Sequence, residues 1–574
     1  MISKVLLLFK THLDIGFTDY AENVVKQYLD TYIPRAIKIG YELKDTDTPF
    51  VWTLGSWMVN EALKYDKSGV VEKAIKDGLI SWHALPFTSH TELMNDKLFR
   101  YGLNISKKLD KKFGKKTVSS KMSDVPGHTR GMIAPLCEYG VKLIHIGVNP
   151  ATPLPDVPKI FRWKHQNNSI VVIYNKGGYG GSFEIGDMAV VFGVTGDNHG
   201  PQTSEEIIQL YEETQKLYPN AKIKAATLND IASLVENLDL PVVEDEIGDT
   251  WIHGVGTDPK KIAGYRSLLR NIKNYDKFDL DDNLLLVPEH TCGLNVQMNF
   301  PYTDCYGCDE LEKYKDDDKY QRIEKSWEEQ RNYVKKAAEV VNFDVAKDIE
   351  VCMPDFSKWK EIAIPEDIPY EVSYQLFDAK DYERLKKEYL QTDILWAIWD
   401  FTKVDLPKYT GGVTTAYVSA AYSDNNGGKC YKLEFDEMVQ RKHGLPVFYL
   451  EERGCNLTLQ WFGKRANKCP EAFWFKFKDL REEWLLDKMG VWTEPQKCLG
   501  NNRLHAVMSG VKNKDVFIES LDAPLVAPFG RHLLDMKFEM KQDLYFNLYN
   551  NVWNTNFPIW YRDDAKFRFV FHRQ

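Results

Sequence analysis

Two side chains of the kinds that ligate metals follow the first apolar run of the chain. His12 and Asp14 lie two residues apart, directly after Val5–Phe9. Alternate residues of an extended segment point the same way, so one imidazole and one carboxylate could reach one cation from a single strand end. Borderline divalent metals accept such mixed nitrogen and oxygen ligands. The pair predicts a metal site, and the alternative is a capping aspartate beside a hydrogen-bonded histidine.

An acid and another histidine occupy similar positions later in the chain. Asp124 follows the expected strand Thr117–Met122, where it either caps the next helix or projects beyond the strand end. Glu289 and His290 follow the apolar run Leu284–Val287. Active sites of α/β barrels lie at the carboxyl ends of strands, so Asp124 is a candidate for the same site as His12.

The segment Asp249–Pro259 places an acid, a tryptophan and a histidine in a glycine-containing loop. Trp251 would suit the face of a sugar ring, and Asp249 would suit proton donation. The alternative is a loop that leads into a helix and buries its tryptophan. Asp258 and Pro259 favour such a helix start, with aspartate as the cap and proline in the first turn.

Charge and cysteine usage exclude several classes of protein. The net charge is -9 and the pI about 5.9, so the chain has no electrostatic footprint for nucleic acid or an anionic membrane. The run Val5–Phe9 is too short for a signal peptide or a membrane span. The nine cysteines are scattered, and Cys305 and Cys308 form a single CxxC that fits loop cysteines better than a structural metal site. We expect a reducing, cytoplasmic location, with the oligomeric state left open.

The first half of the chain alternates short apolar runs with longer amphipathic ones, which predicts a mainly parallel sheet covered by helices. The expected strands are Val5–Phe9, Phe50–Leu54, Ile80–Leu85, Thr117–Met122, Leu143–Val148, Ala189–Val194 and Ile223–Thr227. The expected helices are Tyr20–Leu43, Asn60–Lys76, Leu93–Phe113, Arg130–Tyr139 and Ser204–Leu217. Seven repeats favour a (β/α)7-type barrel, with a hairpin over Phe161–Tyr174 and a flexible glycine-rich loop over Lys176–Ser182.

The second half changes character twice. From Pro259 to Val341 the pattern is helical, and Ser326–Val341 is a clear amphipathic helix. After Asn342, short β-rich runs alternate with turn residues, which predicts an antiparallel β-sandwich. We therefore expect a barrel domain over residues 1–257, a three-helix bundle over 258–345 and a β-sandwich over 346–574.

Together these segments resemble glycoside hydrolase family 38, the α-mannosidases. The family opens with a strand that ends in His-x-Asp, matched by His12 and Asp14. Its nucleophile lies in an Asp-Pro-Phe-Gly-His type of segment, and Asp124–His128 looks like a variant of it. Its acidic, tryptophan-containing segment before a helix is similar to Asp249–Pro259. A closer resemblance, over nearly the whole chain, is to an uncharacterised bacterial family related to these enzymes.

The resemblance implies a metal, usually zinc, held by His12, Asp14, Asp124 and one more histidine. The family takes that histidine from a His-His-Asp-x-x-x-Gly segment, which is absent here. His290 is the best substitute and His253 the rival. A set of two histidines and two aspartates could also take Co²⁺, Mn²⁺ or Ca²⁺.

The resemblance also implies a retaining glycosidase that acts on a terminal sugar. Asp124 would attack the anomeric carbon, and a second carboxyl would protonate the leaving oxygen. Asp249 is the favoured acid, with Glu289 and Glu92 as alternatives. The expected contacts with a carbohydrate substrate come from four further side chains: Trp251, His253, Glu289 and Trp57.

Two other functions fit parts of the pattern. Polysaccharide deacetylases share a similar barrel and bind metal through aspartate and histidine, but they activate water on an acetyl group. A carbohydrate-binding protein that has lost its acid would keep the pocket without catalysis. Acetate release would decide for the first, and the lack of a carboxyl facing Asp124 would favour the second.

Overall fold

The computed structural model describes residues 1–272, 282–390, 393–478, 480 and 483–573. The chain divides into two compact units that are interleaved in sequence. Unit 1 comprises Met1–Thr91, Asp96–Ile247 and Pro288–Thr291, and unit 2 comprises Glu92–Asn95, Gly248–Val287 and Cys292–Gln574. The division into three domains at residues 257 and 345 stays a prediction. Among the described residues, no helix combines the length and apolar character needed to cross a membrane.

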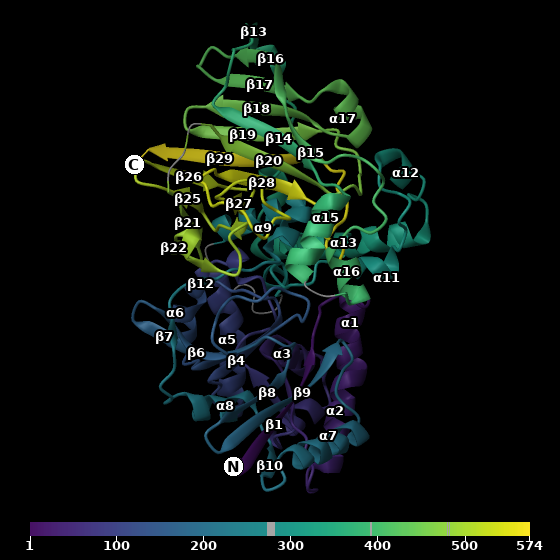
Figure 1. Cartoon of the computed structure of the whole chain (residues 1–574), viewed down its shortest axis with the longest axis vertical. Helices are drawn as coiled ribbons and strands as arrows, with labels where there is room; N and C mark the ends of the chain where they lie inside the picture. The colour runs from purple at the N-terminus through teal and green to yellow at the C-terminus, as the bar shows by residue number, and fades with distance from the viewer. Residues whose placement is uncertain (273–281, 391–392, 479, 481–482, 574) are drawn as a thin grey trace. The chain divides into compact units, whose positions relative to one another are not determined.

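Strand β1 (Lys4–His12) is the centre of the first sheet of unit 1 (Figure 1). Its apolar run is buried along almost its whole length, as expected for a strand covered on both faces. It pairs in parallel with three strands of the sheet. The sheet order is β3 (Ile80–His83), β2 (Trp52–Gly55), β1, β9 (Met188–Asp197) and β8 (Gly181–Ile185), with β10 (Lys222–Ala225) also paired to β1.

The second sheet of unit 1 contains the expected hairpin. Strands β6 and β7 pair antiparallel over the predicted Phe161–Tyr174 segment, so the hairpin is confirmed. The sheet order is β11 (Val242–Val243), β6 (Ile160–His165), β7 (Asn168–Asn175), β5 (Leu143–Val148) and β4 (Ser119–Asp124).

The closed barrel is not confirmed, because the described strands form two hydrogen-bonded sheets. One backbone hydrogen bond, from Ala84 N to Ser119 O at 2.9 Å, joins the residue after β3 to the start of β4. A single core nevertheless includes residues of both sheets, among them Leu8, Leu143 and Phe192. The strands of the two sheets therefore enclose one apolar core, although the described strands form no continuous hydrogen-bonded sheet around it.

The helices of unit 1 follow the predicted positions, except that one expected helix is divided and the helix Leu228–Val235 was not predicted. They are α1 (Ala21–Gln27), α2 (Ile33–Leu43), α3 (Ser56–Tyr65), α4 (Val70–Lys76), α5 (Asp96–Phe113), α6 (Ile133–Glu138), α7 (Ser204–Leu217) and α8 (Leu228–Val235). The single helix expected over Asn60–Lys76 is wrong, because it is divided between α3 and α4. Gly69 has φ +80°, and the Asp66 carboxylate accepts the N–H groups of Ser68 and Val71, so a turn replaces the helix there.

The helical part of unit 2 contains two long helices, α9 (Pro259–Asn271) and α13 (Asp318–Val341). Asp258 and Pro259 begin α9 as predicted, since the Asp258 side chain accepts the N–H of Lys261 at 3.0 Å. The other described helices here are short: α10 (Asn283–Leu286), α11 (Val296–Asn299), α12 (Cys308–Glu312) and α14 (Val345–Asp348). The three-helix bundle is therefore not confirmed, and residues 273–281 lie outside the description.

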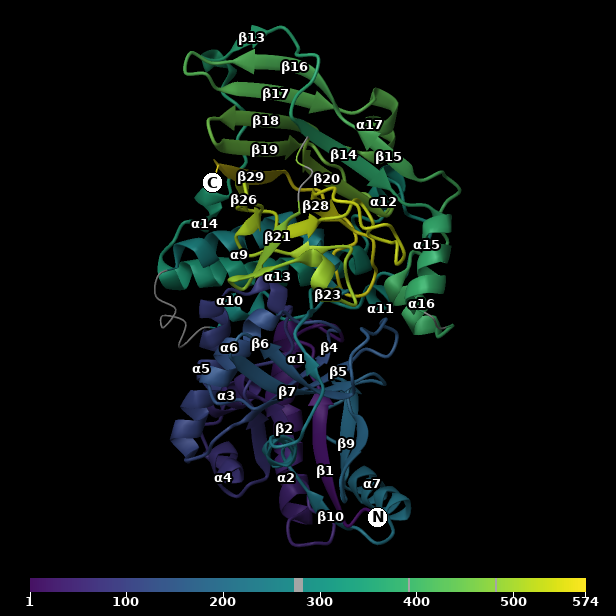
Figure 2. The ribbon, with the colours of Figure 1, turned by 60° about the vertical axis from the view of Figure 1, so that its left-hand side comes forward.

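The rest of unit 2 consists mainly of two antiparallel sheets (Figure 2). The larger has the order β13 (Lys360–Ile362), β16 (Tyr417–Ser423), β17 (Lys429–Glu434), β18 (Val447–Arg453), β19 (Asn456–Phe462), β29 (Ala565–Arg573), β26 (Val516–Ser520), β25 (Gly510–Lys512), β21 (Leu485–Lys488) and β22 (Val491–Thr493). The smaller has the order β15 (Gly412–Thr415), β14 (Tyr370–Leu376), β20 (Glu471–Phe477), β28 (Tyr545–Asn550), β27 (Leu525–Ala527) and β24 (His505–Ala506). One aromatic-rich core joins them, so this region is a β-sandwich. Its helices are α15 (Ala379–Leu385), α16 (Leu395–Phe401) and α17 (Glu437–His443).

Asp258 links the two long helices, and its loss should destabilise unit 2. Its second oxygen accepts from Arg331 Nε at 2.7 Å while the first caps α9. Burial opposes ionisation of Asp258, but Arg331 outweighs it and holds the pKa below its ordinary value. We expect Asp258→Ala to lower the free energy of unfolding by about 2–3 kcal/mol at pH 7. Because the folded-state pKa is depressed, this contribution should be present above the unfolded pKa of about 4 and be lost as the pH falls below it.

Urea unfolding of the wild type and of Asp258→Ala at pH 7 and pH 3.5 measures that difference. Equal losses at the two pH values would contradict the assignment of the ion pair. Asp344→Ala, which removes an exposed cap of the short helix α14, is the matched control and should cost less.

Candidate functional site

Three of the predicted metal ligands converge within unit 1. One ligand atom of each of His12, Asp14 and His290 lies within 4.8 Å of the others, and all three residues are buried. Asp14 Oδ1 is 3.3 Å from His12 Nε2 and 3.0 Å from His290 Nε2. The two Nε2 atoms are 3.3 Å apart. The end of β1 and the segment Pro288–Thr291 thus present two imidazoles to one carboxylate oxygen.

Each imidazole is oriented through its other nitrogen. His12 Nδ1 is 2.8 Å from Ser123 Oγ on β4, and His290 Nδ1 is 2.5 Å from Glu289 Oε1. The second oxygen of Glu289 accepts the N–H of Thr291 at 3.0 Å, which fixes the carboxylate. Partners of this kind set the tautomer and the ring orientation of metal-binding histidines. Glu289, predicted as an acid or a sugar contact, lies where it orients His290.

The donor set fits a divalent cation. Among the described residues, Asp14 Oδ2 is buried and has no hydrogen-bond partner. Burial opposes ionisation of Asp14, but His12 and His290 outweigh it and hold its pKa below the ordinary value. A buried, ionised carboxylate with an unsatisfied oxygen beside two imidazole nitrogens is a combination that zinc and similar metals accept. The cluster of His12, Asp14 and His290 could therefore hold such an ion, with Asp124 next to it.

Asp124 ends strand β4 in a strained conformation. Its φ is +80°, in the left-handed region that non-glycine residues rarely adopt. Asn149 Nδ2 and the Tyr179 hydroxyl donate to Asp124 Oδ1 at 3.0 and 2.8 Å. Asp124 Oδ2 lies 3.7 Å from His290 Nε2. One oxygen is thus held by neutral donors, and the other is turned toward the histidine cluster.

The glycine-rich loop supplies Tyr179, a site residue that the sequence did not predict. Its ring lies 4.3 Å from the ring of His12. Burial and the nearby carboxylate of Asp124 raise the pKa of Tyr179 well above its ordinary value, so it remains a hydrogen-bond donor. Lys121 Nζ donates to the carbonyl of Tyr179, and a Cβ added to Gly147 would lie 2.5 Å from the same oxygen. The loop expected to be flexible is held against β4 and β5 at this point.

Asp197 is a second site residue that sequence reasoning missed. It ends β9 and is paired with His12 across a β-bulge. Burial and the charge of Asp14 raise the pKa of Asp197 to about 6. Its Oδ1 has no hydrogen-bond partner among the described residues. A carboxyl of this kind can hold a proton near neutral pH.

Three residues of the predicted loop belong to unit 2. Asp249 is fully buried, and its side chain accepts the N–H of Trp251 at 2.8 Å. Trp251 packs against Phe401 with ring centroids 5.7 Å apart. His253 lies edge-on to Trp553 at 4.0 Å. The cluster of potential metal ligands contains His290 and not His253, and the catalytic role of Asp249 stays a prediction.

Trp57, predicted as a possible sugar contact, is 4% exposed on α3. Its ring packs edge-on against Phe87 at 5.6 Å. This placement is that of a core residue, and a role for Trp57 at a sugar subsite stays a prediction.

Gly147 should be essential for the position of Tyr179. A methyl group at this residue would force the Tyr179 carbonyl off β5, so we expect Gly147→Ala to cost about 1–3 kcal/mol of unfolding free energy. Gly177→Ala, in the same loop, meets no atom within 4 Å and is the matched control, expected to change stability by less than about 0.5 kcal/mol. Chemical denaturation of both variants measures this, and equal stabilities would show that the loop is not seated on β5.

Two solved structures from Enterococcus faecalis are similar to the chain in fold. An alpha-mannosidase from E. faecalis V583 aligns with a TM-score of 0.58 at 9% identity, over 100% of this chain and 87% of that one. A protein in the glycosyl hydrolase family 38 from E. faecalis aligns with a TM-score of 0.51 at 9% identity, over 100% and 86%.

Sequence comparisons add one match. A family profile described as a domain of unknown function (DUF5054) matches residues 255–363. No curated protein sequence matches the chain. The full-length structural likeness shows that this chain has the fold of the glycosyl hydrolase family 38 proteins.

Proposed function

We propose that the chain is a metal-dependent retaining glycoside hydrolase, α-mannosidase-like, that cleaves a terminal glycosidic bond through a glycosyl ester on Asp124. The observation that carries the proposal is the convergence of His12, Asp14 and His290 beside Asp124 at the carboxyl ends of parallel strands. The fold shared with an alpha-mannosidase supports the same interpretation.

His12, Asp14 and His290 would hold the cation, with Asp124 as a further ligand. When bound, the metal supplies a positive charge that binds and orients neighbouring hydroxyls of the sugar. Ser123 and Glu289 keep the two imidazoles aligned through the nitrogens that face away from the cluster.

Asp124 is the proposed nucleophile. Its carboxylate would attack the anomeric carbon as the bond to the leaving oxygen breaks, which forms a glycosyl ester. Tyr179 and Asn149 donate to Asp124 Oδ1, so they would hold the carboxylate in one rotamer until attack. Water then cleaves the ester, and two displacements at one carbon retain its configuration.

A second carboxyl must give its proton to the leaving oxygen and later take one from water. Asp249 is the residue that sequence reasoning favours for this step. Within unit 1, Asp197 is the rival, because it lies opposite His12 on β9 and because burial and the charge of Asp14 raise its pKa, which favours a protonated carboxyl. We propose Asp197 as the acid/base and test it against Asp249.

Metal content tests the proposed ligands. Purified wild-type protein should contain about one divalent metal ion per chain, and His12→Ala should lose most of it. Glu289→Gln, which leaves the ligands in place but removes a charged partner of His290, should weaken metal binding by about 10–100-fold. Elemental analysis and titration of the apoprotein with zinc measure both effects.

Cys305→Ser is the control for the alternative that the CxxC holds the metal, and it should leave the stoichiometry unchanged. Unchanged metal in His12→Ala would remove His12 from the ligand set. Loss of metal in Cys305→Ser would place the ion elsewhere.

The dependence of the rate on the leaving group tests the identity of the acid. With Asp197→Asn, hydrolysis of a nitrophenyl mannoside should fall by about 10²–10⁴-fold, whereas a dinitrophenyl mannoside should lose far less, because its leaving group needs no proton. Since the donor is protonated only below its pKa, the wild-type rate should fall as the pH rises through that pKa, which lies below about 6 when a cation at Asp14 offsets the charge that raises it. Asp197→Asn should lack this limb of the pH profile.

Asp249→Asn is the matched comparison. If Asp249→Asn shows the leaving-group dependence and Asp197→Asn does not, Asp249 is the acid. NMR of the first-formed sugar reports the stereochemistry, and inversion would contradict the glycosyl ester. Acetate release without glycoside cleavage would replace the proposal with a deacetylase.

A further inference from the structure

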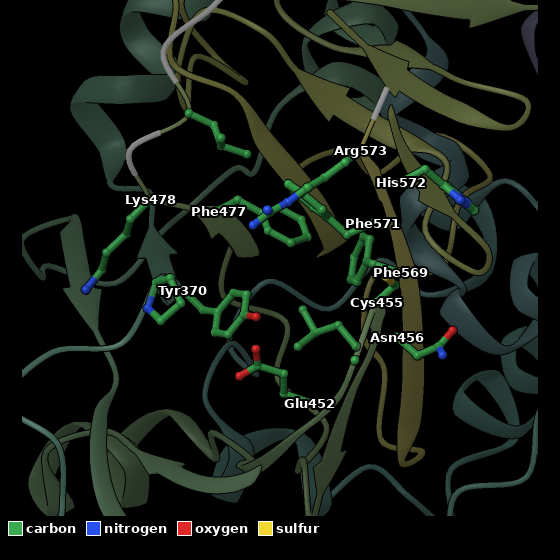
Figure 3. Close-up of a pocket in the computed structure, with 14 residues that line it drawn as sticks. Tyr370, Glu452, Cys455, Asn456, Phe477, Lys478, Phe569, Phe571, His572 and Arg573 are labelled. Atoms are coloured by element: carbon green, nitrogen blue, oxygen red, sulfur yellow. The ribbon is translucent and has the colours of Figure 1, made fainter. Parts of the chain in front are cut away.

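The β-sandwich of unit 2 contains a pocket that the proposed glycosidase site does not use (Figure 3). Its volume is about 750 Å³, within the usual range for small-molecule sites. It is lined from both sheets, by Tyr370 of β14, Phe477 of β20, and Phe569 and Phe571 of β29. The turn between β18 and β19 adds Cys455, and the start of β19 adds Leu457.

The buried part of the pocket wall is apolar. Leu457, Phe477 and Phe569 are 4%, 8% and 1% exposed, and they continue the core of the sandwich. Tyr370 and Phe571 are half-buried and pack against Phe477, with ring centroids 5.8 and 6.1 Å apart. Rings held by the core form a preorganised surface for an apolar group, which loses little entropy on binding.

Of the basic side chains that line the pocket, Lys478 and His572 have acidic partners and Arg573 has none among the described residues. Lys478 forms an ion pair with Asp367, and His572 lies 3.4 Å from Glu519. Within the described part of the chain, Arg573 has neither an ion pair nor a side-chain hydrogen bond. Figure 3 shows its side chain extending over the rings, whereas that of His572 points away.

The carboxylate of the pocket is already engaged. Burial raises the pKa of Tyr370, and the Glu452 carboxylate, which interacts with the Tyr370 hydroxyl, raises it further. In Figure 3 the Glu452 and Arg573 side chains lie on opposite sides of the rings. An anion at Arg573 would therefore meet an unpaired guanidinium without facing Glu452 directly.

We propose that this pocket binds an amphipathic monoanion, with an apolar tail among the rings of Tyr370, Phe477 and Phe571 and a carboxylate at Arg573. Guanidinium pairs with carboxylate through two parallel hydrogen bonds, and the apolar walls would take the tail out of water. A neutral sugar fits less well, because Leu457, Phe477 and Phe569, which form the buried part of the wall, have no group that can hydrogen-bond its hydroxyls. The proposal does not depend on the glycosidase activity.

Two exposed thiols make the test possible. Cys455 lines the pocket, and Cys352 is exposed without lining it. With decanoate below its micellar concentration, alkylation of Cys455 by iodoacetamide should slow by about tenfold, while alkylation of Cys352 is unchanged. Decyltrimethylammonium has the same tail with the opposite charge, and it should protect Cys455 much less.

Arg573→Gln tests the anion site directly. By calorimetry this variant should bind decanoate about tenfold more weakly than the wild type and lose most of the salt dependence, with decanol binding unchanged. Arg441→Gln, at an exposed arginine of α17 outside the pocket, is the matched control and should behave as the wild type. Unaltered thermal unfolding of both variants shows that they are folded.

Each other result overturns the proposal. Equal protection by decanoate and decyltrimethylammonium would show a purely apolar pocket. Protection of Cys455 by methyl mannoside but not by decanoate would make it a sugar site. No protection and no heat of binding with decanoate would show that the pocket does not take this class of ligand.

Discussion

Two imidazole rings and a carboxylate meet at the end of β1 with very little solvent around them. Their Nε2 atoms are 3.3 Å apart, and both face Asp14 Oδ1. If neither Nε2 carries a proton, two lone pairs face one another, and if both do, two N–H groups face one another. The two nitrogens are satisfied when only His290 Nε2 carries a proton and donates to Asp14 and His12, or when both nitrogens bind one metal ion. Ser123 and Glu289 hold the opposite nitrogens, so neither ring can turn away without losing a buried hydrogen bond. A metal ion bound between them would meet both nitrogens and the carboxylate oxygen at once, and the function proposed for this chain depends on that arrangement.

The strands β1 and β4, which carry these groups, also have buried polar side chains between the apolar core and the strand ends. Alternate residues of β1 place Leu6 and Leu8 in the apolar core and Lys10 and His12 farther along the same face. On β4, Lys121 lies 2.8 Å from His145 Nδ1 and also donates to the Tyr179 carbonyl. Burial lowers the pKa of Lys121 well below its ordinary value. The hydrogen bond from Lys121 on β4 thus fixes the loop that contains Tyr179, and the Tyr179 hydroxyl in turn holds Asp124.

Site residues that directly follow an apolar run could be predicted from the sequence. His12 and Asp14 were identified because Val5–Phe9 has the pattern of a buried strand and the side-chain repeat of a strand puts both on one side. Asp197 was missed because the apolar run stops at Val194, whereas β9 continues through a polar end and a bulge to Asp197. Tyr179 was missed because a glycine-rich loop has no periodicity, and its position is set by contacts with Lys121 and Gly147 that are distant in sequence.

The same limit applies to the fold. Strand and helix types follow from local pattern, so most elements of unit 1 lie where they were expected. Closure of a barrel depends on ladders between distant strands, and local pattern does not report whether the edge of β3 pairs fully with β4 or only through Ala84 and Ser119. The helix break at Gly69 is a different case, because Asp66 and Gly69 are turn residues that the sequence already displayed.

The most direct test of the metal site is a crystal of the protein grown with zinc, with diffraction measured on both sides of the zinc absorption edge. We expect one strong anomalous peak within about 2.0–2.3 Å of the Nε2 atoms of His12 and His290 and of carboxylate oxygens of Asp14 and Asp124. Fully loaded protein with no peak among these four residues, or with its peak at the cysteines Cys305 and Cys308, would contradict the metal site proposed for this chain.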